Sequence, residues 1–501
     1  MRHDERPMNL ADLLRSSATT SPRKTALVVA STDATMTFAE LDADVDRIAA
    51  ALQARGLSKG DRVALALPNT AEFVISYFAV LRAGGVVIPF NVMLTAPEMR
   101  RILADAQARF AIAADPYLEA VRAAAAHEGD VEIISVAAWD SLGQTGSRPD
   151  EPSTEPDDLA ILAYTSGTTG EPKGAMLTHG NLLANLQQQM DIPDDTVGPD
   201  DILLLSLPMF HIFGLNVPLG LLVRNGATGV VVERFVPVDA LRIIDRYKPT
   251  VMFGAPPLYT ALVETPGADQ YDLSSVRLAI SGAAPLAEET LKAFYETFGV
   301  HIYEGYGLTE TAPTLTTNRM TGDPRPGSVG KPLPGIELKI LDEEGNPVEF
   351  GDPGEIVVRG PNVFAGYWNK PDETSKVLRD GWFYTGDVGV ADEEGYIYLV
   401  DRKRDLIIVS GFNVFPSEVE AALVENPIVK EAAVVGVKHP YTGEAVKAYV
   451  VLQPGEKAPE SELMADIQTR LARFKCPGSI EIVDELPHLP TGKVLKRALR
   501  T

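Results

Sequence analysis

The sequence lacks the features on which several classes of protein depend. Only one of its 501 residues is a cysteine, Cys476, which excludes a disulfide framework and a zinc site built from thiolates. The seven histidines form no HExxH pair, so nothing suggests a zinc protease. No run of about 18 apolar residues occurs, and the polar N-terminus lacks the apolar core of a signal peptide. We therefore expect a cytoplasmic protein with no integral membrane segment.

Positive charge is also scarce. The chain has 45 Lys and Arg against 69 Asp and Glu, a net charge of −24. Nucleic acid and anionic membranes are therefore unlikely partners, because both require a basic surface. The acidic excess is confined to residues 1–400, since residues 401–501 hold 14 basic and 14 acidic residues. This asymmetry suggests a boundary near residue 400 and leaves room for small anionic ligands, which need only a local positive site.

What is present is the composition of a globular protein, with 45% apolar and 23% charged residues and a length typical of two to four domains. Residues 40–55 carry apolar side chains at helical spacing, and Asp61–Leu67 is an apolar run typical of a buried strand. A helix over Phe73–Leu81 and a strand over Val86–Pro89 follow. This alternation predicts an α/β fold with parallel sheets covered by helices on both faces.

The pattern changes after about residue 320. Short alternating segments between Gly, Pro and Asp turns predict a small β-barrel-like unit, and residues beyond 405 alternate strands and helices in a compact α+β pattern. We therefore predict a large N-terminal domain over 1–400, made of two βα-layered subdomains (about 1–190 and 191–320) and a β subdomain (321–400). A smaller α+β domain over 405–501 follows.

The strongest local signal is the segment Tyr164–Gly174, which reads YTSGTTGEPKG. It follows a predicted buried strand, Leu159–Ala163. Glycines allow close approach of the backbone to a ligand, hydroxyl and N–H groups can surround phosphate oxygens, and Lys173 adds a positive charge. The spacing differs from GxxxxGK[ST], so this is not a P-loop of that kind. The segment predicts phosphate binding, and a solvent-exposed polar turn is the alternative.

With this segment and others along the sequence, the chain resembles the adenylate-forming superfamily, which comprises acyl-CoA synthetases, firefly-type luciferases and peptide-synthetase adenylation domains. The resemblance covers nearly the whole chain. It is carried by segments whose order and spacing are more specific than any one of them: Met36–Leu41, Leu81–Pro89, Tyr306–Glu310, Tyr384–Asp387, Asp401–Asp405 and Pro490–Lys493. It implies that ATP activates a small-molecule carboxylic acid, that the C-terminal domain is mobile about a hinge at 401–404, and it allows a homodimer.

The resemblance implies a nucleotide site built from several short segments. The residues around the phosphates are Thr165, Ser166, Gly167, Thr168, Thr169, Gly170, Lys173 and Thr309. Adenine is expected against Gly282, Ala283 and Ala284, flanked by Glu304, Gly305, Tyr306 and Gly307, with Tyr306 stacking on the ring. Asp387 and Arg402 are expected at the ribose. Glu310 is the expected ligand of Mg²⁺, because a carboxylate beside phosphates requires a cation.

Three residues of the last domain have roles implied by the same resemblance. Lys493 is expected to hold the carboxylate against the α-phosphate and to stabilise the charge that develops there. Arg404 matches the hinge position, and Gly411 borders the channel for the pantetheine arm of coenzyme A. Ordinary explanations remain for single residues: an Asx cap for Asp387, a solvated charge for Arg404, a surface lysine for Lys493 and a turn for 281–285.

Residues 207–223 resemble the segment that borders the acyl pocket, with His211 at the aromatic gate position; a core histidine is the alternative. Apart from His211 they contain no acid and no base. An amino-acid substrate would need an aspartate here and a dicarboxylate an arginine, so an apolar tail is favoured. We expect an ATP-dependent ligase that joins a medium- or long-chain fatty acid to coenzyme A. The alternatives are an aryl-CoA ligase, an acyl-AMP ligase that loads a carrier protein, and a non-enzymatic binding module.

Overall fold

The computed structural model describes most of the chain: residues 8–94, 96–126, 131–143, 146–150, 152–166, 172–193, 196–284, 286–320, 322, 324–402, 407–409, 412–414, 416–439, 443–471, 473, 475–489 and 493–499. The chain forms two compact units. The first contains residues up to Glu337 together with Arg359–Phe383, and the second contains Leu338–Val358 and Tyr384 onward.

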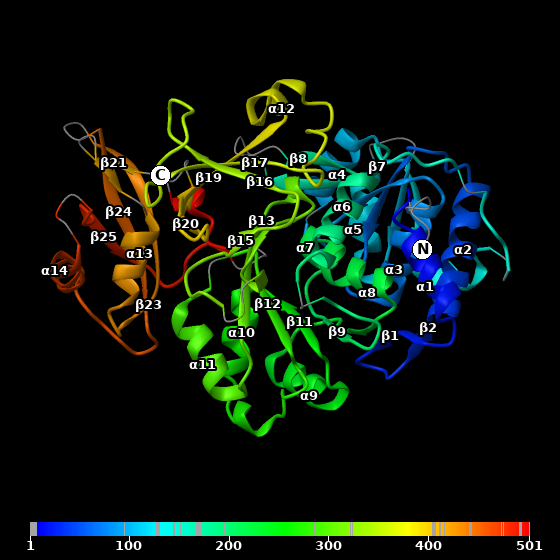
Figure 1. The fold of residues 1–501 in the computed structure, drawn as a ribbon, viewed down its shortest axis with the longest axis horizontal. Coiled ribbons are helices and arrows are strands. Elements are labelled where there is room, and N and C mark those ends of the chain that lie inside the picture. Colours follow the sequence, from blue (N-terminus) through cyan, green and yellow to red (C-terminus); the bar gives the residue numbers. More distant parts are fainter. Residues whose placement is uncertain are drawn as a thin grey trace. The chain divides into compact units, whose positions relative to one another are not determined.

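The first unit contains a six-stranded sheet (Figure 1). Its strands, in spatial order, are β6 (Glu132–Ser135), β5 (Phe110–Ala113), β3 (Arg62–Ala66), β4 (Val86–Pro89), β7 (Leu159–Ser166) and β8 (Pro172–Thr178). All neighbours are parallel except β7 and β8, which form an antiparallel hairpin. Helices α4 (Ala96–Ala106) and α5 (Asp115–Ala125) bury Met99, Ile102, Leu103 and Val121 in the core of this sheet.

A nine-stranded sheet forms the rest of the core of this unit. Its order is β15 (Lys331–Pro332), β14 (Thr314–Thr317), β13 (Ile302–Gly307), β12 (Leu278–Ser281), β11 (Val251–Gly254), β9 (Ile202–Leu205), β10 (Thr228–Val231), β1 (Thr25–Val29) and β2 (Thr35–Thr37). The strands from β13 to β1 are parallel. Helices α9 (Pro237–Tyr247), α10 (Pro256–Val263) and α11 (Glu288–Phe298) contribute to its hydrophobic core.

Local chemistry explains why the helices begin where they do. Thr37 starts α2 (Phe38–Ala54) with a capping box, in which its hydroxyl accepts from the N–H of Glu40 and Glu40 reaches back. Thr70 caps α3 (Ala71–Arg82) in the same way through its hydroxyl. Helix α6 (His179–Met190) starts from a similar box at Thr178, directly after β8. Two further helices of this unit are α1 (Asp12–Thr20) and α8 (Gly220–Asn225).

The second unit contains two sheets. One joins β16 (Glu337–Leu341), β17 (Gly354–Arg359), β19 (Trp382–Ala391) and β20 (Ile397–Arg402). Helix α12 (Pro371–Val377) and strand β18 (Leu378–Arg379), which pairs with the start of β19, belong to the first unit. The other joins β22 (Phe412–Val414), β21 (Ile407–Val409), β24 (Gly443–Leu452), β23 (Val429–His439) and β25 (Ser479–Ile482). Helices α13 (Pro416–Val424) and α14 (Glu460–Arg470) pack on the second sheet.

The predicted α/β class is confirmed, and so are most predicted elements. The amphipathic pattern of residues 40–55 is α2, whose Leu41, Val45 and Ile48 are buried. The predicted strand Val86–Pro89 is β4. The proposed hinge at 401–404 stays a prediction, because Lys403 and Arg404 lie outside the described residues. Among helices built from the described residues, none is both long and apolar enough to cross a membrane.

Candidate active site

The predicted site residues of the first unit follow the carboxyl ends of parallel strands. Ser166 is the last residue of β7, and Gly282 directly follows β12. Glu304 and Tyr306 lie in the second half of β13. The segment 207–223 follows β9 in the same sheet as β12 and β13. Ligands in open α/β sheets bind outside the carboxyl ends of strands, so this arrangement matches a nucleotide site.

The predicted phosphate loop connects the two strands of the β7–β8 hairpin. Thr165 is opposite Lys173 and Ser166 is opposite Pro172, and Thr165 is half-buried. Gly167, Thr168, Thr169 and Gly170 lie outside the described residues. The register therefore puts the Lys173 side chain at the base of the loop, where it is 9% exposed.

Lys173 belongs to a chain of polar contacts that ends at Glu310. Its ammonium group pairs with the carboxylate of Glu373 in α12 and lies 5.3 Å from the ring centre of Tyr367. The Tyr367 hydroxyl donates to Glu310 Oε1 at 2.8 Å. Hydrogen bonds from Lys173 and then Lys376 lower the pKa of Glu373 to about 2, so this carboxylate is charged at neutral pH. A phosphate group that approached Lys173 would compete with Glu373.

The loop after β12 is held by a buried carboxyl group. Glu304 is 6% exposed, and its Oε1 accepts from the N–H of Leu286 at 3.1 Å, whereas Oε2 has no hydrogen-bond partner among the residues that the structure describes. The same loop contains Ala283, an exposed residue with φ of 73°, a conformation that an alanine rarely adopts. Glu304 thus positions the segment Gly282–Ala284 that was predicted to receive adenine.

Burial also changes the protonation of Glu304. Desolvation raises the pKa of this carboxyl to about 7, and the Leu286 N–H offsets only part of the shift. The folded-state pKa exceeds the usual value of 4.5, so this group contributes full stability below pH 4.5 and loses it as pH rises to about 7. The 2.5-unit difference corresponds to about 3 kcal/mol.

We expect Glu304→Gln to unfold at a higher temperature than the wild type at pH 8, with a free-energy gain of up to about 3 kcal/mol, because glutamine fills the same space without charge. At pH 4.5 the two proteins should be equally stable. Thermal unfolding between pH 4.5 and 8 measures this, with the exposed Glu288→Gln as the control. A stability difference that does not change with pH would contradict the assignment.

The end of β13 approaches other backbone closely. A Cβ atom on Gly307 would lie 1.9 Å from the carbonyl oxygen of Pro313, so only glycine fits there. A Cβ atom on Gly305 would lie 3.1 Å from the carbonyl oxygen of Thr316. Tyr306 is buried on the same face as Glu304, and half-buried Thr309 opens a 3₁₀ turn over Thr309–Thr311 that carries Glu310.

His211 and its neighbours form the predicted acyl wall. The His211 Nδ1 accepts from the N–H of Phe213 at 3.3 Å and caps a short helix, α7 (Ile212–Gly214). Burial lowers the pKa of His211, so the ring is neutral at pH 7, with the proton on Nε2. The Phe213 ring lies against Gly282, because a Cβ atom added to Gly282 would be 3.1 Å from that ring. The same ring meets the Phe253 ring edge-on. The structure thus brings the acyl wall next to the loop after β12.

The second unit carries the predicted ribose residues. Asp387 on β19 is paired in register with Arg402 on β20, and Asp387 is 6% exposed. The turn before it is fixed by the Thr385 hydroxyl, which donates to the carbonyl of Ile356 at 2.7 Å. Gly386 adopts φ of 74° there. Arg404 and Gly411, the predicted hinge and pantetheine residues, lie outside the described residues.

Lys493 is exposed near the end of the chain. Its carbonyl oxygen accepts from the N–H of Leu489 at 2.7 Å, and Leu495 donates back to Pro487 at 2.7 Å. These bonds join the two segments that flank Pro490–Gly492, three residues that lie outside the described part of the chain. Cys476, by contrast, is part-buried, and burial raises the pKa of its thiol, which fits a non-catalytic cysteine.

The sequence analysis missed Tyr367, Glu373 and Phe213. Tyr367 contacts Glu310 from 57 residues away, and Glu373 contacts Lys173 from 200 residues away. No periodicity reveals such pairs. One feature of the sequence could have pointed to Tyr367 as a site residue: Tyr367 and Trp368 directly follow a glycine. An aromatic pair in a turn-rich segment needs a packing partner.

Comparison with known proteins agrees with this geometry. Residues 14–368 match the AMP-binding enzyme family, and residues 418–493 match its C-terminal domain family. The chain is 39% identical to a long-chain-fatty-acid–CoA ligase of Bacillus subtilis, over 98% of this chain and 94% of that protein. It is also 39% identical to a feruloyl-CoA synthase of Amycolatopsis, over 93% of each.

A solved structure gives the same result for the fold. ATP-bound MatB from Rhodopseudomonas palustris superposes with a TM-score of 0.90 at 36% identity, covering 99% of this chain and 98% of the other. The family match covers most of the chain, and both units of the fold and the position of the candidate site at the strand ends agree with it. The chain therefore belongs to the AMP-binding enzyme family.

Proposed function

We propose that this acyl-CoA ligase activates a medium- or long-chain fatty acid with ATP and transfers the acyl group to coenzyme A. The observation that carries the proposal is the acyl wall. Its Met209, Ile212 and Leu215 are at most 4% exposed, and its Phe213 ring lies against the loop that was predicted to receive adenine. An apolar tail placed along this wall would be removed from water while few polar groups of the protein lost their hydration.

The first half-reaction needs positive charge and hydrogen-bond donors around the α-phosphate. The acid carboxylate attacks the α-phosphorus of ATP, giving the acyl adenylate and pyrophosphate. We assign Lys173 and Thr309 to the phosphates and Lys493 to the bridging region between carboxylate and α-phosphate, where it stabilises developing charge. When phosphate binds, Lys173 would release the carboxylate of Glu373 and pair with a phosphate oxygen instead, which fits a phosphate-binding lysine.

Glu310 fits Mg²⁺ as one ligand among several. Among the described residues, no cluster of three or more His, Cys, Asp and Glu side chains could hold a metal ion. Mg²⁺ bound with ATP commonly takes one or two protein carboxylates and completes its shell with phosphate oxygens and water. Glu310, oriented by the Tyr367 hydroxyl, would be that carboxylate. The ion would neutralise phosphate charge.

The second half-reaction uses other residues. The thiol of coenzyme A attacks the acyl carbonyl and AMP leaves. Lys493 must withdraw before this step and the segment at Gly411 must line the path of the pantetheine arm, so we place a rotation about Arg404 between the two half-reactions. An acyl-AMP ligase that loads a carrier protein would differ here, because AMP release would not depend on coenzyme A.

A panel of acids tests the substrate class. With straight-chain acids from acetate to oleate, we expect kcat/KM for AMP release dependent on coenzyme A to rise about fourfold per methylene, until the pocket is filled. The reason is that each buried methylene contributes about 0.8 kcal/mol. Coumarate, the aromatic member of the panel, should be slower than the best fatty acid.

An aryl-CoA ligase is the second candidate. The edge-on pair of Phe213 and Phe253 favours it, because aromatic rings pack well on such an edge. A higher kcat/KM for coumarate than for any fatty acid would establish this alternative. A preference for acetate would reject both.

A further inference from the structure

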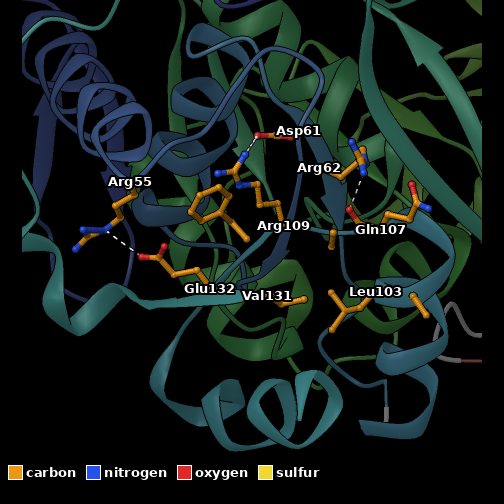
Figure 2. Close-up of a pocket in the computed structure, with 11 residues that line it drawn as sticks. Arg55, Asp61, Arg62, Leu103, Gln107, Arg109, Val131 and Glu132 are labelled. Carbon is orange, nitrogen blue, oxygen red and sulfur yellow. Dashed lines mark hydrogen bonds and ion pairs between the residues drawn. The ribbon is translucent and has the colours of Figure 1, made fainter. Parts of the chain in front are cut away.

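A cavity of about 680 Å³ lies at the amino ends of β3, β5 and β6 (Figure 2). Arg62 starts β3, Arg109 immediately precedes β5, and Glu132 starts β6. The predicted phosphate loop follows the carboxyl end of β7, which runs parallel to these strands through β4. The cavity therefore lies at the amino ends of the parallel strands, whereas the phosphate loop lies at their carboxyl ends. The mechanism proposed above does not use the cavity.

Three guanidinium groups and two carboxylates line the cavity, which leaves one positive charge in excess. Arg109 pairs with Asp61 at 2.9 Å and Arg55 with Glu132 at 3.5 Å, as Figure 2 shows. Both arginine side chains are exposed by about two fifths, at 45% and 40%, so a ligand can reach them.

Arg62 differs from the other two arginines. Its guanidinium donates to the main-chain oxygens of Gly60, Ala106 and Gln107 at 3.0, 2.7 and 2.7 Å. Within the described residues it forms no ion pair with a carboxylate, unlike Arg55 and Arg109. The contacts fix the guanidinium in place at the C-terminal end of α4, which is the pre-organisation that anion recognition requires.

Gln107 is the next residue after α4 and adopts φ of 51°, a left-handed conformation that usually selects glycine. Its side chain lines the cavity beside Arg62 (Figure 2). An amide placed there can donate to a bound oxygen. Leu103, Phe110 and Val131 give the cavity an apolar wall, and the centre of the Phe110 ring lies 5.6 Å from the guanidinium carbon of Arg109. Polar donors and apolar side chains in one lining fit an organic anion better than a bare ion.

We propose that this cavity binds a small organic phosphate monoester, with the phosphate held by Arg55, Arg62 and Arg109 and the organic part on the apolar wall. Guanidinium groups match phosphate oxygens in paired geometry, and a dianion can compete with Asp61 and Glu132 for the arginines. The volume is within the range of sites for ligands of this size. The proposal does not depend on the substrate class proposed above.

The cavity is also connected to the candidate active site by direct contacts. Arg62 lies 5.7 Å from the ring centre of Trp368, whose Nε1 donates to the carbonyl of Asp105 at 3.1 Å. The Asp105 carboxylate accepts from Tyr164 at 2.6 Å. Tyr164 precedes the phosphate loop, and Trp368 follows Tyr367, the partner of Glu310. An anion bound at Arg62 changes the electric field at Trp368 and should therefore be detected by the fluorescence of this tryptophan.

Phenyl phosphate is the probe that tests the proposal on the full-length protein, by calorimetry and by tryptophan emission. We expect saturable binding that weakens at least tenfold in Arg55→Gln/Arg109→Gln, whose side chains are exposed and do not cap α4. Arg122→Gln, on exposed α5 outside the cavity, should bind as the wild type does. Inorganic phosphate should bind at least tenfold more weakly than phenyl phosphate, because it leaves the apolar wall unused.

Trp368→Phe should remove the emission change but keep the calorimetric binding. The proposal is overturned if the wild type shows no saturable binding of phenyl phosphate, or if Arg55→Gln/Arg109→Gln binds it as tightly as the wild type. Equal affinity for inorganic phosphate and phenyl phosphate would also overturn it, since the apolar wall would then contribute nothing.

Discussion

Lys493→Ala is expected to slow acid-dependent ATP–pyrophosphate exchange by about 10²–10³-fold, the loss typical of removing one group that stabilises charge in a transition state. Thioester formation from supplied acyl adenylate and coenzyme A should keep the wild-type rate. The reason is that only the first half-reaction develops charge between the carboxylate and the α-phosphate. Two assays on one protein preparation measure this, one for each half-reaction.

The control for Lys493 is Lys457→Ala, which removes another exposed loop lysine of the second unit. It should leave both half-reactions unchanged, which separates a specific role from a general effect of charge. Lys493 is itself exposed, so its replacement should not alter the unfolding temperature. An equal loss in both half-reactions would show that Lys493 does not act in adenylation alone.

Glu310→Gln should lower kcat/KM for ATP by about 10²–10³-fold and raise the Mg²⁺ concentration needed for half-maximal rate. Glutamine keeps the size of Glu310 and can still accept from the Tyr367 hydroxyl, 2.8 Å away, so the change isolates the negative charge. Steady-state rates over a Mg²⁺ titration at fixed ATP measure both effects.

The matched control is Tyr367→Phe, which keeps the charge of Glu310 and removes the hydroxyl that orients it. A hydrogen bond to a charged group contributes about 1.5–3 kcal/mol, so a loss of about 10–150-fold in kcat/KM is expected, with little change in Mg²⁺ dependence. Wild-type Mg²⁺ dependence in Glu310→Gln would contradict the assignment of Glu310 as a metal ligand.

The sequence predicted the local parts of the fold well. Helix α2 has a capping threonine at its start and apolar residues at helical spacing, and both features are readable without the structure. The predicted strands before residues 164 and 281 are also present, which is why the loops after them could be named as site candidates. Strand ends in α/β folds carry function, so a correct strand gives a usable prediction of the site.

Contacts between distant segments could not be predicted in the same way. Strand β1 lies near the N-terminus yet pairs with β10, and the pairing depends on the whole sheet rather than on residues 25–29. The segment with Tyr367 and Glu373 runs beside β8 through main-chain bonds such as Trp368 N–H to the Gly174 carbonyl at 2.8 Å. Those bonds leave no mark in the sequence, so the partners of Lys173 and Glu310 emerged only from the structure.

The buried Glu304 illustrates the same limit at a single residue. The family resemblance placed Glu304 beside adenine, and the structure adds that its carboxyl group accepts a hydrogen bond from the Leu286 N–H. The raised pKa follows from burial, which is a property of the packed sheet and not of the motif. The residue therefore positions the loop that a nucleotide would contact.

The central claim is that this chain forms an acyl adenylate before coenzyme A takes part, and acid-dependent ATP–pyrophosphate exchange in the absence of coenzyme A tests it most directly. The account predicts full exchange with the preferred fatty acid and no coenzyme A, followed by stoichiometric AMP release once coenzyme A is added. Exchange that requires coenzyme A, or no exchange with any acid of the panel, would contradict it.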